Sequence, residues 1–423
     1  MAKINVLIFP AGEINSVELH DALSSCVNIK VFGASSVDRH GEYIFQNYIS
    51  NVPMINSPVF FDKFNEILTQ NKIDIVFPTH DTVADFFATN HDKIKAKLVV
   101  ADHKTAAICR DKAKTYQLFE RYDFCPKIYS ELITYPVFIK PKQGQGAVGA
   151  RLINRSEELP TDFSDYVVCE YLPGIEYTVD CLTDLNGNLL FISPRSRQRM
   201  MAGVTVAGQN EKLTKDIEFI ANIINSNLNF KGLWWFQIKK DSKDNWKLLE
   251  ISTRCAGTMC LTRVKGVNLP LLSVYILMGY KNITIINNPY NIKMDRTLIS
   301  RYQIDYNYKI VYIDFDDTVT LNDGVNLKVM WFLYQCQNLG IKVNLITKHA
   351  YDIYLTLDKL SISSNLFNEI IKINEDEYKV DYIDPNQAIF IDNSYNERVD
   401  VSLKLGIPVF DVDSIDVLMN WRV

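Results

Sequence analysis

The sequence predicts a multidomain protein of α/β and α+β class, with an α/β domain at each end and an α+β domain between them. Three observations lead to this prediction. The chain has 423 residues, more than a single hydrophobic core normally serves. Strand-like and helix-like segments alternate near both ends. In the middle, strand-like segments follow one another directly, separated by short turns.

Residues 1–105 form the first predicted domain. Runs rich in Val, Ile and Phe, such as INVLIFP and IDIVFP, alternate with segments of helical spacing such as VFFDKFNEIL. This alternation is typical of a parallel sheet covered by helices. The opening apolar run is short and leads into Gly and Glu, so we interpret it as a strand and not as a secretory signal. His80, at the end of a predicted strand, is interpreted as a loop or core histidine.

Residues 106–300 form the second predicted domain. It begins within one predicted helix, KTAAICRDKAKTYQLFERY, and continues with strands such as YVVCEYL and LWWFQIKKD. Turn-forming segments LNGN and DSKDN separate several of these strands, which is an antiparallel pattern. The longest apolar run, LPLLSVYILMGY, is too short to span a bilayer and is predicted to be a buried helix.

Residues 308–423 form the third predicted domain. A polar passage rich in Asn and Tyr, residues 280–308, separates it from the second. Strands KIVYID, KVNLIT, QAIFID and IPVFDV then alternate with helical segments, which indicates a second and smaller parallel α/β domain.

The composition limits the classes of function. The formal net charge is −5, which argues against a nucleic-acid or anionic-membrane surface. The eight cysteines are scattered and form no CxxC pair, as expected for free thiols in a reducing cytoplasm. We therefore expect a cytoplasmic protein whose partners are small molecules.

A glycine-rich loop, KQGQGAVG at residues 143–150, contains Gly144, Gly146 and Gly149 in the order G-x-G-x-x-G. In dinucleotide-binding proteins this pattern joins a strand to a helix whose N-terminus faces the pyrophosphate. Here the following segment, ARLINR, has strand character, so the loop is predicted to join two strands. We interpret it as a lid whose backbone N–H groups approach the phosphates of a nucleoside triphosphate.

Charged and polar residues elsewhere support a triphosphate site. Lys140 lies on the strand before the loop, and Lys112 lies further upstream. Downstream, Gln237 and Glu250 lie on two adjoining predicted strands. Hard oxygen donors beside a triphosphate are what Mg²⁺ prefers, since it usually takes only one or two carboxylates.

In this order and spacing, residues 1–300 resemble an ATP-grasp ligase, and most closely the ATP-binding halves of carbamoyl-phosphate synthetase. The resemblance implies a Rossmann-like pre-ATP-grasp domain followed by the ATP-grasp fold, with ATP and Mg²⁺ as cofactors and Mn²⁺ as a substitute for Mg²⁺. It implies contacts to ATP from Lys112, Lys140, the three glycines of the loop, Glu170, Tyr171 and Leu172 at the adenine hinge, and Glu176 near the ribose.

The same resemblance implies roles for residues further along the chain. Gln237, Glu250 and Ser252 would hold Mg²⁺, and Arg254 would stabilise the transferring phosphoryl group. Ser252 stands where the family usually has Asn, so a second metal ion would be held more weakly. Arg195 and Arg197 resemble residues that grip the acceptor carboxylate or acyl phosphate.

A second site is predicted where the strand KIVYI runs into Asp314, Asp316, Asp317 and Thr318. Carboxylates so close together repel one another, and a cation resolves the repulsion. The D-x-D-x-T pattern resembles motif one of the haloacid dehalogenase-like phosphohydrolases.

That resemblance implies a small Rossmannoid domain, and the short spacing of its motifs leaves no room for a large cap. It implies Asp314 as nucleophile and Asp316 as general acid/base. Thr347 ends a later strand, and Lys379 is preferred over Lys372 as the family's lysine. Asp314, Asp316 and Asp392 would hold Mg²⁺, while Asn393 stands where a second acid is usual and Glu397 or Asp400 can replace it.

The sequence thus predicts a bifunctional enzyme. An ATP- and Mg²⁺-dependent ligase would activate a small carboxylate as an acyl phosphate for attack by an amine-type nucleophile, and a C-terminal phosphatase would act on a related, phosphorylated compound. The substrates are not readable from the sequence, and a homodimer is left open. Two alternatives remain: a carbamoyl-phosphate-synthase-like activity, or a nucleotide-responsive regulatory or binding protein with a silent hydrolase domain.

Overall fold

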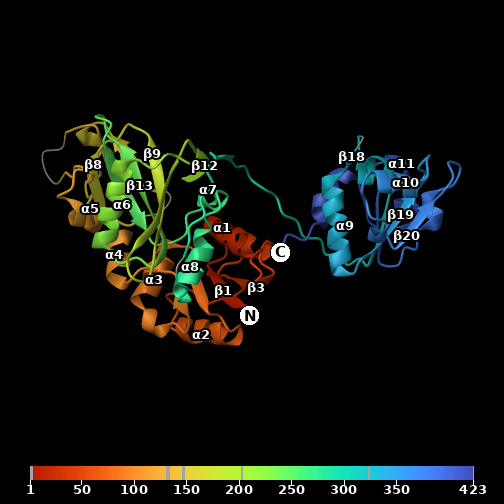
Figure 1. The fold of residues 1–423 in the computed structure, drawn as a ribbon, viewed down its shortest axis with the longest axis horizontal. Coiled ribbons are helices and arrows are strands. Elements are labelled where there is room, and N and C mark those ends of the chain that lie inside the picture. The colour runs from red at the N-terminus through yellow and green to blue at the C-terminus, as the bar shows by residue number, and fades with distance from the viewer. Residues whose placement is uncertain are drawn as a thin grey trace. The chain divides into compact units, whose positions relative to one another are not determined.

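The computed structural model describes residues 3–129, 134–144, 148–201, 203–281, 283–322 and 324–422. The chain divides into two compact units, shown in Figure 1. Unit 1 comprises Met1–Leu298 and Arg422–Val423, and unit 2 spans Ile299–Trp421. Within the described ranges, no helix has both the length and the apolar character needed to cross a membrane.

Unit 1 begins with a parallel sheet in the strand order β3-β2-β1-β4-β5. Its strands are β1 (Ile4–Phe9), β2 (Ile29–Ala34), β3 (Asn47–Ile49), β4 (Ile75–Pro78) and β5 (Lys97–Leu98). Successive side chains of a strand point to opposite faces, and both faces of β1 are buried. Val6 and Ile8 belong to one hydrophobic core, and Leu7 and Phe9 to another. This explains why the strands are apolar along their whole length.

Helices cover both faces of this sheet (Figure 1). One face packs against α1 (Ile14–Leu23) and α8 (Leu269–Leu277), which contact each other although they lie far apart in the sequence. The other face packs against α2 (Phe60–Gln70) and α3 (Asp81–Thr89). Helix α8 is the apolar run predicted to be a buried helix, and its buried residues include Leu269, Val274 and Ile276.

The predicted single helix over residues 104–122 is wrong, because the structure has two helices there. These are α4 (His103–Arg110) and α5 (Lys112–Phe119). Asp111 between them has an extended backbone, and its carboxylate accepts hydrogen bonds from the backbone N–H groups of Ala113 and Lys114. Such an N-cap satisfies donors that a new helix leaves free, so it starts α5 at Lys112.

The centre of unit 1 is an antiparallel sheet in the order β10-β9-β13-β14. Its strands are β9 (Glu176–Thr183), β10 (Leu189–Ser196), β13 (Gly232–Lys240) and β14 (Trp246–Ser252). One face buries Trp234, Phe236 and Ile238 against α6 (Lys215–Asn227). Gln237 and Lys239 point to the opposite face, where they line a cavity.

Two smaller antiparallel sheets flank the central sheet. The first has the order β7-β6-β8 and consists of β6 (Val137–Pro141), β7 (Arg151–Ile153) and β8 (Tyr166–Glu170). The glycine loop joins β6 to β7, which pair antiparallel, so the prediction that it joins two strands is confirmed. The second has the order β11-β12-β15, with β11 (Arg199–Met201), β12 (Val204–Gln209) and β15 (Lys293–Asp295). Helix α7 (Cys260–Arg263) lies beside this sheet.

Unit 2 is built on a parallel sheet in the order β20-β19-β16-β21-β22. Its strands are β16 (Ile310–Ile313), β19 (Lys342–Thr347), β20 (Glu369–Lys372), β21 (Ala388–Ile391) and β22 (Val409–Phe410). Helices α9 (Leu327–Leu339), α10 (Ile353–Lys359) and α11 (Tyr395–Leu405) complete it. Between β16 and α9 the chain makes a single wide turn, Phe315–Val319, and a hairpin of β17 (Thr320–Leu321) and β18 (Gly324–Val325).

Candidate functional site

The polar face of the central sheet carries the residues predicted to bind a metal ion. Gln237 on β13 and Glu250 on β14 are direct partners in the antiparallel ladder, so their side chains lie on the same face. A cavity of about 430 Å³ opens there. Residues predicted from the sequence that line it are Lys112, Lys140, Gly144, Glu176, Arg195, Arg197, Gln237, Glu250 and Arg254.

Lys140 is buried, at 7% exposure, in the wall of this cavity. Its Nζ donates hydrogen bonds to the Tyr116 hydroxyl and to the Leu249 backbone carbonyl. Burial lowers the pKa of Lys140, and the nearby Lys112 acts in the same direction. Because both bonding partners of its ammonium group are neutral, Lys140 would gain from an anion in the cavity.

Lys112 is the first residue of α5 and reaches the same cavity. Its Nζ lies 3.4 Å from a carboxylate oxygen of Glu250. The end of α4 and the start of α5 at Asp111 therefore place Lys112 at the first position of a helix beside β14. The structure thus brings Lys112, Lys140, Gln237 and Glu250 together around one cavity.

Arg254 follows β14 and pairs with a residue that the sequence analysis did not identify. Its guanidinium donates to both carboxylate oxygens of Asp81, at 2.8 and 2.9 Å. Ser252 also donates its hydroxyl to Asp81, at 3.2 Å. Burial alone would raise the pKa of Asp81, but the guanidinium outweighs it and the pKa is lowered. Asp81 directly follows His80, which the sequence analysis considered. Its position at the end of a predicted strand is the feature that could have identified Asp81 from the sequence.

His80 has a structural role that agrees with its interpretation as a loop residue. It is the N-cap of α3, and its Nδ1 accepts a hydrogen bond from the backbone N–H of Thr82. The carboxylate of Asp81, one residue later, is the group that reaches the site.

Arg195 and Arg197, predicted to bind substrate, have different surroundings. Arg195 is 2% exposed and forms a bidentate pair with the fully buried Asp180, at 2.9 Å for both bonds, and it also donates to the Thr258 hydroxyl. Arg197 donates to Glu176 at 2.5 Å and to the Thr205 hydroxyl at 2.9 Å. Both arginines line the cavity, but their charges are balanced by carboxylates within the fold.

The predicted adenine-hinge residues are Glu170, Tyr171 and Leu172. Glu170 ends β8, and its carboxylate accepts a hydrogen bond from the backbone N–H of Lys127 at 2.8 Å. Tyr171 is partly exposed and Leu172 is buried. Among the residues that the structure describes, these three do not line the 430 Å³ cavity. A second hollow of about 1010 Å³ lies beside α5 and β8 and is lined by Lys127 and Lys247, which both lie near Glu170.

The predicted glycine lid is described in part. Gly144 lines the cavity, and its carbonyl accepts a hydrogen bond from Arg110 at 3.1 Å. Gly149 has a φ of 77°, a conformation that residues with a side chain rarely adopt. Gly146 lies outside the described residues.

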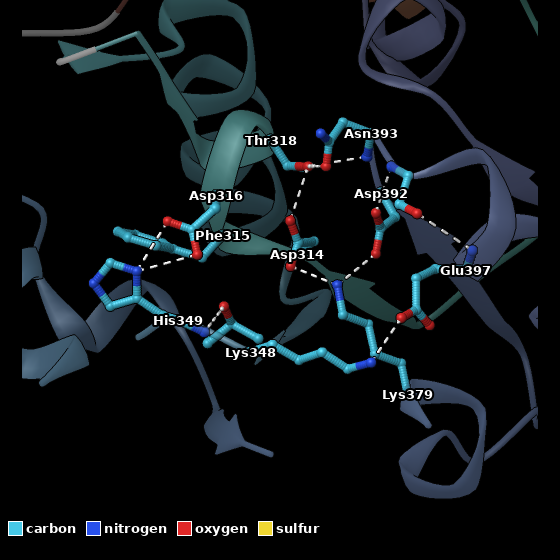
Figure 2. Close-up of polar contacts among 12 residues, drawn as sticks. Asp314, Phe315, Asp316, Thr318, Lys348, His349, Lys379, Asp392, Asn393 and Glu397 are labelled. Atoms are coloured by element: carbon cyan, nitrogen blue, oxygen red, sulfur yellow. Dashed lines mark hydrogen bonds and ion pairs between the residues drawn. The ribbon is translucent and has the colours of Figure 1, made fainter. Parts of the chain in front are cut away.

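Unit 2 gathers a second set of predicted residues at the carboxyl ends of its parallel strands (Figure 2). Asp314 follows β16, and Asp392 follows β21. The ammonium of Lys379 lies between them and donates to one carboxylate oxygen of each, both at 2.6 Å. Lys372, the other lysine considered, is exposed and donates to the Tyr351 carbonyl.

Burial shapes the protonation of this cluster. It raises the pKa of Asp314 to about 6, an effect that Lys379 opposes and Asp392 reinforces. Burial also raises the pKa of Asp392. Burial alone would lower the pKa of Lys379, but the two carboxylates outweigh it and the pKa is raised. One shared cation thus allows two buried carboxylates to face each other.

Asp316 lies apart from the pair that Lys379 joins. Its carboxylate faces His349 Nδ1, at 2.9 and 3.1 Å (Figure 2). In the part of the chain that the structure describes, no three His, Cys, Asp or Glu side chains are grouped closely enough to hold a metal ion. Asp314 and Asp392 thus face Lys379 while Asp316 faces the imidazole, and the assignment of these three residues to Mg²⁺ stays a prediction.

The remaining predicted residues support the ends of the strands. Thr347 is fully buried, and its hydroxyl accepts a hydrogen bond from the His349 backbone N–H at 3.1 Å. The Thr318 hydroxyl contacts Asp314 at 3.3 Å and the side-chain oxygen of Asn393 at 3.2 Å. Glu397, considered as a replacement acid, pairs with Lys348 at 3.1 Å.

All eight cysteines are free, as predicted.

Comparisons with known proteins bear on unit 1. A family model described as ATP-grasp in the biosynthetic pathway with Ter operon matches residues 162–306. A search of the curated proteins gave no match.

Solved structures resemble the chain at low sequence identity. N5-carboxyaminoimidazole synthetase from Staphylococcus aureus, complexed with ADP, has a TM-score of 0.57 at 15% identity and covers 70% of this chain and 82% of that one. The biotin carboxylase domain of 2-oxoglutarate carboxylase from Hydrogenobacter thermophilus, in complex with MgADP, gives 0.55 at 17%, covering 69% and 74%. An L-amino acid ligase from Bacillus licheniformis gives 0.53 at 15%, covering 66% and 75%.

The family match and the shared fold agree with the mixed α/β architecture of the structure. They confirm the ATP-grasp part of the resemblance drawn from the sequence. The resemblance of residues 308–423 to phosphohydrolases stays a prediction. The chain contains an ATP-grasp domain.

Proposed function

We propose that unit 1 is a ligase that uses ATP to activate a small carboxylic acid as an acyl phosphate, which an amine-type nucleophile then captures. The observation that supports this most is the arrangement around one cavity of two lysines, Lys112 and Lys140, with the ladder partners Gln237 and Glu250. The solved structures with the same fold include proteins bound to ADP, and one is an L-amino acid ligase.

The residues of the cavity fit ATP and Mg²⁺. The amide oxygen of Gln237 and the carboxylate of Glu250 are the hard donors that Mg²⁺ takes, and the buried ammonium of Lys140 suits a phosphate. A bound Mg²⁺ would neutralise negative charge on the phosphates. Lys112, now paired with Glu250, would be free to contact phosphate once that carboxylate binds the ion.

Within this proposal the chain's residues position the reacting groups and stabilise the negative charge of the transferring phosphate. The substrate carboxylate oxygen forms a bond to the γ-phosphorus, and the bond from that phosphorus to the ADP oxygen breaks. Lys140 and Arg254 stabilise negative charge that shifts onto phosphate oxygens during this transfer. An amine then attacks the acyl carbon, inorganic phosphate leaves, and an amide-type bond remains.

This function is tested by mixing the purified full-length protein with ATP, MgCl₂ and a panel of carboxylic acids and amines, and measuring ADP. We expect ADP release only when a particular acid is present, and expect a Glu250→Ala variant to lose it. ADP release that is equal with and without every acid would contradict the proposal.

We also propose that unit 2 is a phosphatase. The observation that favours it is Lys379, which bridges Asp314 and Asp392 at the carboxyl ends of neighbouring strands. Asp314, Asp316 and Asp392 would hold Mg²⁺, which would neutralise charge on the phosphate, and the steps proposed here concern the chain's own residues. Asp314 attacks the phosphorus, the bond to the leaving oxygen breaks, and Asp316 gives that oxygen a proton. Water then hydrolyses the aspartyl phosphate, and Asp316 takes a proton from the water.

The phosphatase is tested by following hydrolysis of p-nitrophenyl phosphate by the full-length protein in MgCl₂. We expect turnover that Asp314→Asn removes and that Glu250→Ala leaves in place. Turnover unaffected by Asp314→Asn would place the activity elsewhere.

A further inference from the structure

His349 contacts Asp316, the predicted general acid, on one side and Thr356 on the other. The function proposed above gives His349 no role. It comes two residues after Thr347, where the chain leaves β19. It is 8% exposed, whereas more than half of the Asp316 side chain is exposed. An exposed carboxylate would normally sample several rotamers, so a fixed partner matters for its orientation.

The imidazole contacts Asp316 through both carboxylate oxygens. The distances from Nδ1 are 2.9 Å to Oδ1 and 3.1 Å to Oδ2 (Figure 2). An ionised carboxylate only accepts, and a protonated carboxyl still keeps an oxygen that accepts, so we assign the proton of this contact to Nδ1. A donor shared between two oxygens restricts rotation of the carboxylate more than a contact to one oxygen does.

The opposite side of the ring is anchored to α10. His349 Nε2 lies 2.8 Å from the Thr356 hydroxyl oxygen, and that hydroxyl also bonds the Asp352 backbone carbonyl at 3.0 Å. Asp352 is the N-cap of α10, where its carboxylate accepts from two backbone N–H groups. The imidazole therefore has a hydrogen-bonding partner at both nitrogens. The partner at Nε2 belongs to the first turn of α10, whose N-cap is Asp352.

Aromatic contacts hold the ring from the sides. The Phe315 ring, beside Asp316 in the sequence, meets the imidazole edge to face with centroids 5.1 Å apart. The Tyr351 ring meets it at 5.8 Å. The His349 backbone N–H also donates to Thr347 at 3.1 Å, which ties the histidine to the end of β19.

We propose that His349 is a positioning residue that fixes the orientation of the Asp316 carboxyl, two residues after Asp314 in the chain, so that Asp316 can deliver its proton to the leaving oxygen. This inference rests on the proposed phosphatase function. The role concerns orientation: His349 touches neither the phosphorus nor the leaving group, and the proton transferred is the one on Asp316.

The ratio of the rates for two esters with different leaving groups tests this role, because a purely structural role of His349 would leave that ratio unchanged. An alkoxide such as that from glycerol 2-phosphate needs a proton as it leaves, whereas p-nitrophenolate leaves readily without one. We expect His349→Leu, which keeps most of the side-chain bulk, to lower kcat/KM for glycerol 2-phosphate about 100-fold and kcat/KM for p-nitrophenyl phosphate less than about threefold, since a positioned acid contributes on the order of 10²–10⁴. The ratio kcat/KM reports phosphoryl transfer to Asp314 and not the later hydrolysis of the aspartyl phosphate, which is the same for both esters.

A conservative variant distinguishes lost orientation from a damaged fold. In His349→Asn the side-chain amide can donate from about the position of Nδ1, so kcat/KM for glycerol 2-phosphate should recover most of the loss. Thr356→Val removes the anchor at Nε2 while keeping the imidazole, and an intermediate loss is expected. Thermal unfolding of each variant would be followed beside the kinetics.

The outcomes separate this inference from the function on which it rests. If wild type and Asp314→Asn hydrolyse neither ester, the phosphatase assignment fails and the inference fails with it. If wild type hydrolyses both esters but His349→Leu lowers kcat/KM equally for both, or for neither, the phosphatase stands and the positioning role is overturned. A value of kcat/KM for glycerol 2-phosphate as low in His349→Asn as in His349→Leu would also overturn it.

Discussion

The carboxylate of Asp81 accepts two parallel hydrogen bonds from the guanidinium of Arg254, at 2.8 and 2.9 Å. Asp81 begins α3, beside the parallel sheet, while Arg254 follows β14 of the central antiparallel sheet. The pair therefore links two parts of unit 1 at the edge of the cavity. A planar fork bonded at two points has little freedom to rotate, so Asp81 sets the orientation of Arg254.

The first prediction concerns this pair. Asp81→Asn keeps the shape but removes the charge and one acceptor, so Arg254 is no longer held in one plane. We expect kcat for acid-dependent ADP release to fall by about 100-fold, as is typical when a transition-state group is misplaced by about 1 Å. Steady-state kinetics would measure it, with Asp85→Asn on the same helix as the matched control. An Asp81→Asn enzyme with wild-type kcat would show that this pairing does not matter for catalysis.

The second prediction concerns pH. Burial lowers the pKa of Lys140, so its ammonium loses its proton at a lower pH than an exposed lysine would. The charged form binds phosphate, and we expect kcat/KM for ATP to decline as the pH rises into the alkaline range. Lys140→Arg keeps a charge throughout this range, so the decline should disappear. If both enzymes show the same alkaline limb, another group is responsible.

The third prediction concerns stability. Asp180 and Arg195 form a buried ion pair, and removing one partner leaves the other charge without compensation. We expect Asp180→Leu to reduce the free energy of unfolding by about 3–5 kcal/mol, and the double variant Asp180→Leu with Arg195→Met to recover most of it. Urea unfolding followed by fluorescence would measure both. If Arg195→Met alone leaves stability unchanged but raises KM for the acid, its predicted substrate role would be favoured over this structural one.

The fourth prediction compares two lysines in unit 2. Lys379 bridges Asp314 and Asp392, while Lys372 is exposed and bonds a backbone carbonyl. We expect Lys379→Met to lower hydrolysis of p-nitrophenyl phosphate by at least about 100-fold, a loss usual for a preorganised charged group. Lys372→Met serves as the control and should retain activity. The reverse pattern would show that the choice between the two lysines was wrong.

Several local sequence patterns predicted the fold around the site. Gln237 and Glu250 were placed on two adjoining strands, and the structure makes them direct partners in the antiparallel ladder. The strand after the glycine loop was also correct, because its residues lack helical spacing. The helix over residues 104–122 was wrong because one side chain, Asp111, can cap a new helix in the middle of a continuous apolar period.

Pairings between distant residues could not be read from the sequence. Asp81 and Arg254 are separated by most of unit 1, and Asp180 meets Arg195 only through the pairing of β9 with β10. Arg195 was predicted to bind substrate from a family resemblance, and its buried partner Asp180 was not foreseen. His349 was missed for the same reason, since its contact with Asp316 depends on how two strand ends approach each other.

The measurement that tests the two-site account most directly is ADP release by three full-length proteins with ATP, MgCl₂ and the acid that wild type uses. We expect wild type and Asp314→Asn to release ADP at similar rates and Glu250→Ala to release almost none. If Asp314→Asn alone abolishes ADP release, ATP is turned over in unit 2 and the assignment of ligase chemistry to the cavity of unit 1 is wrong.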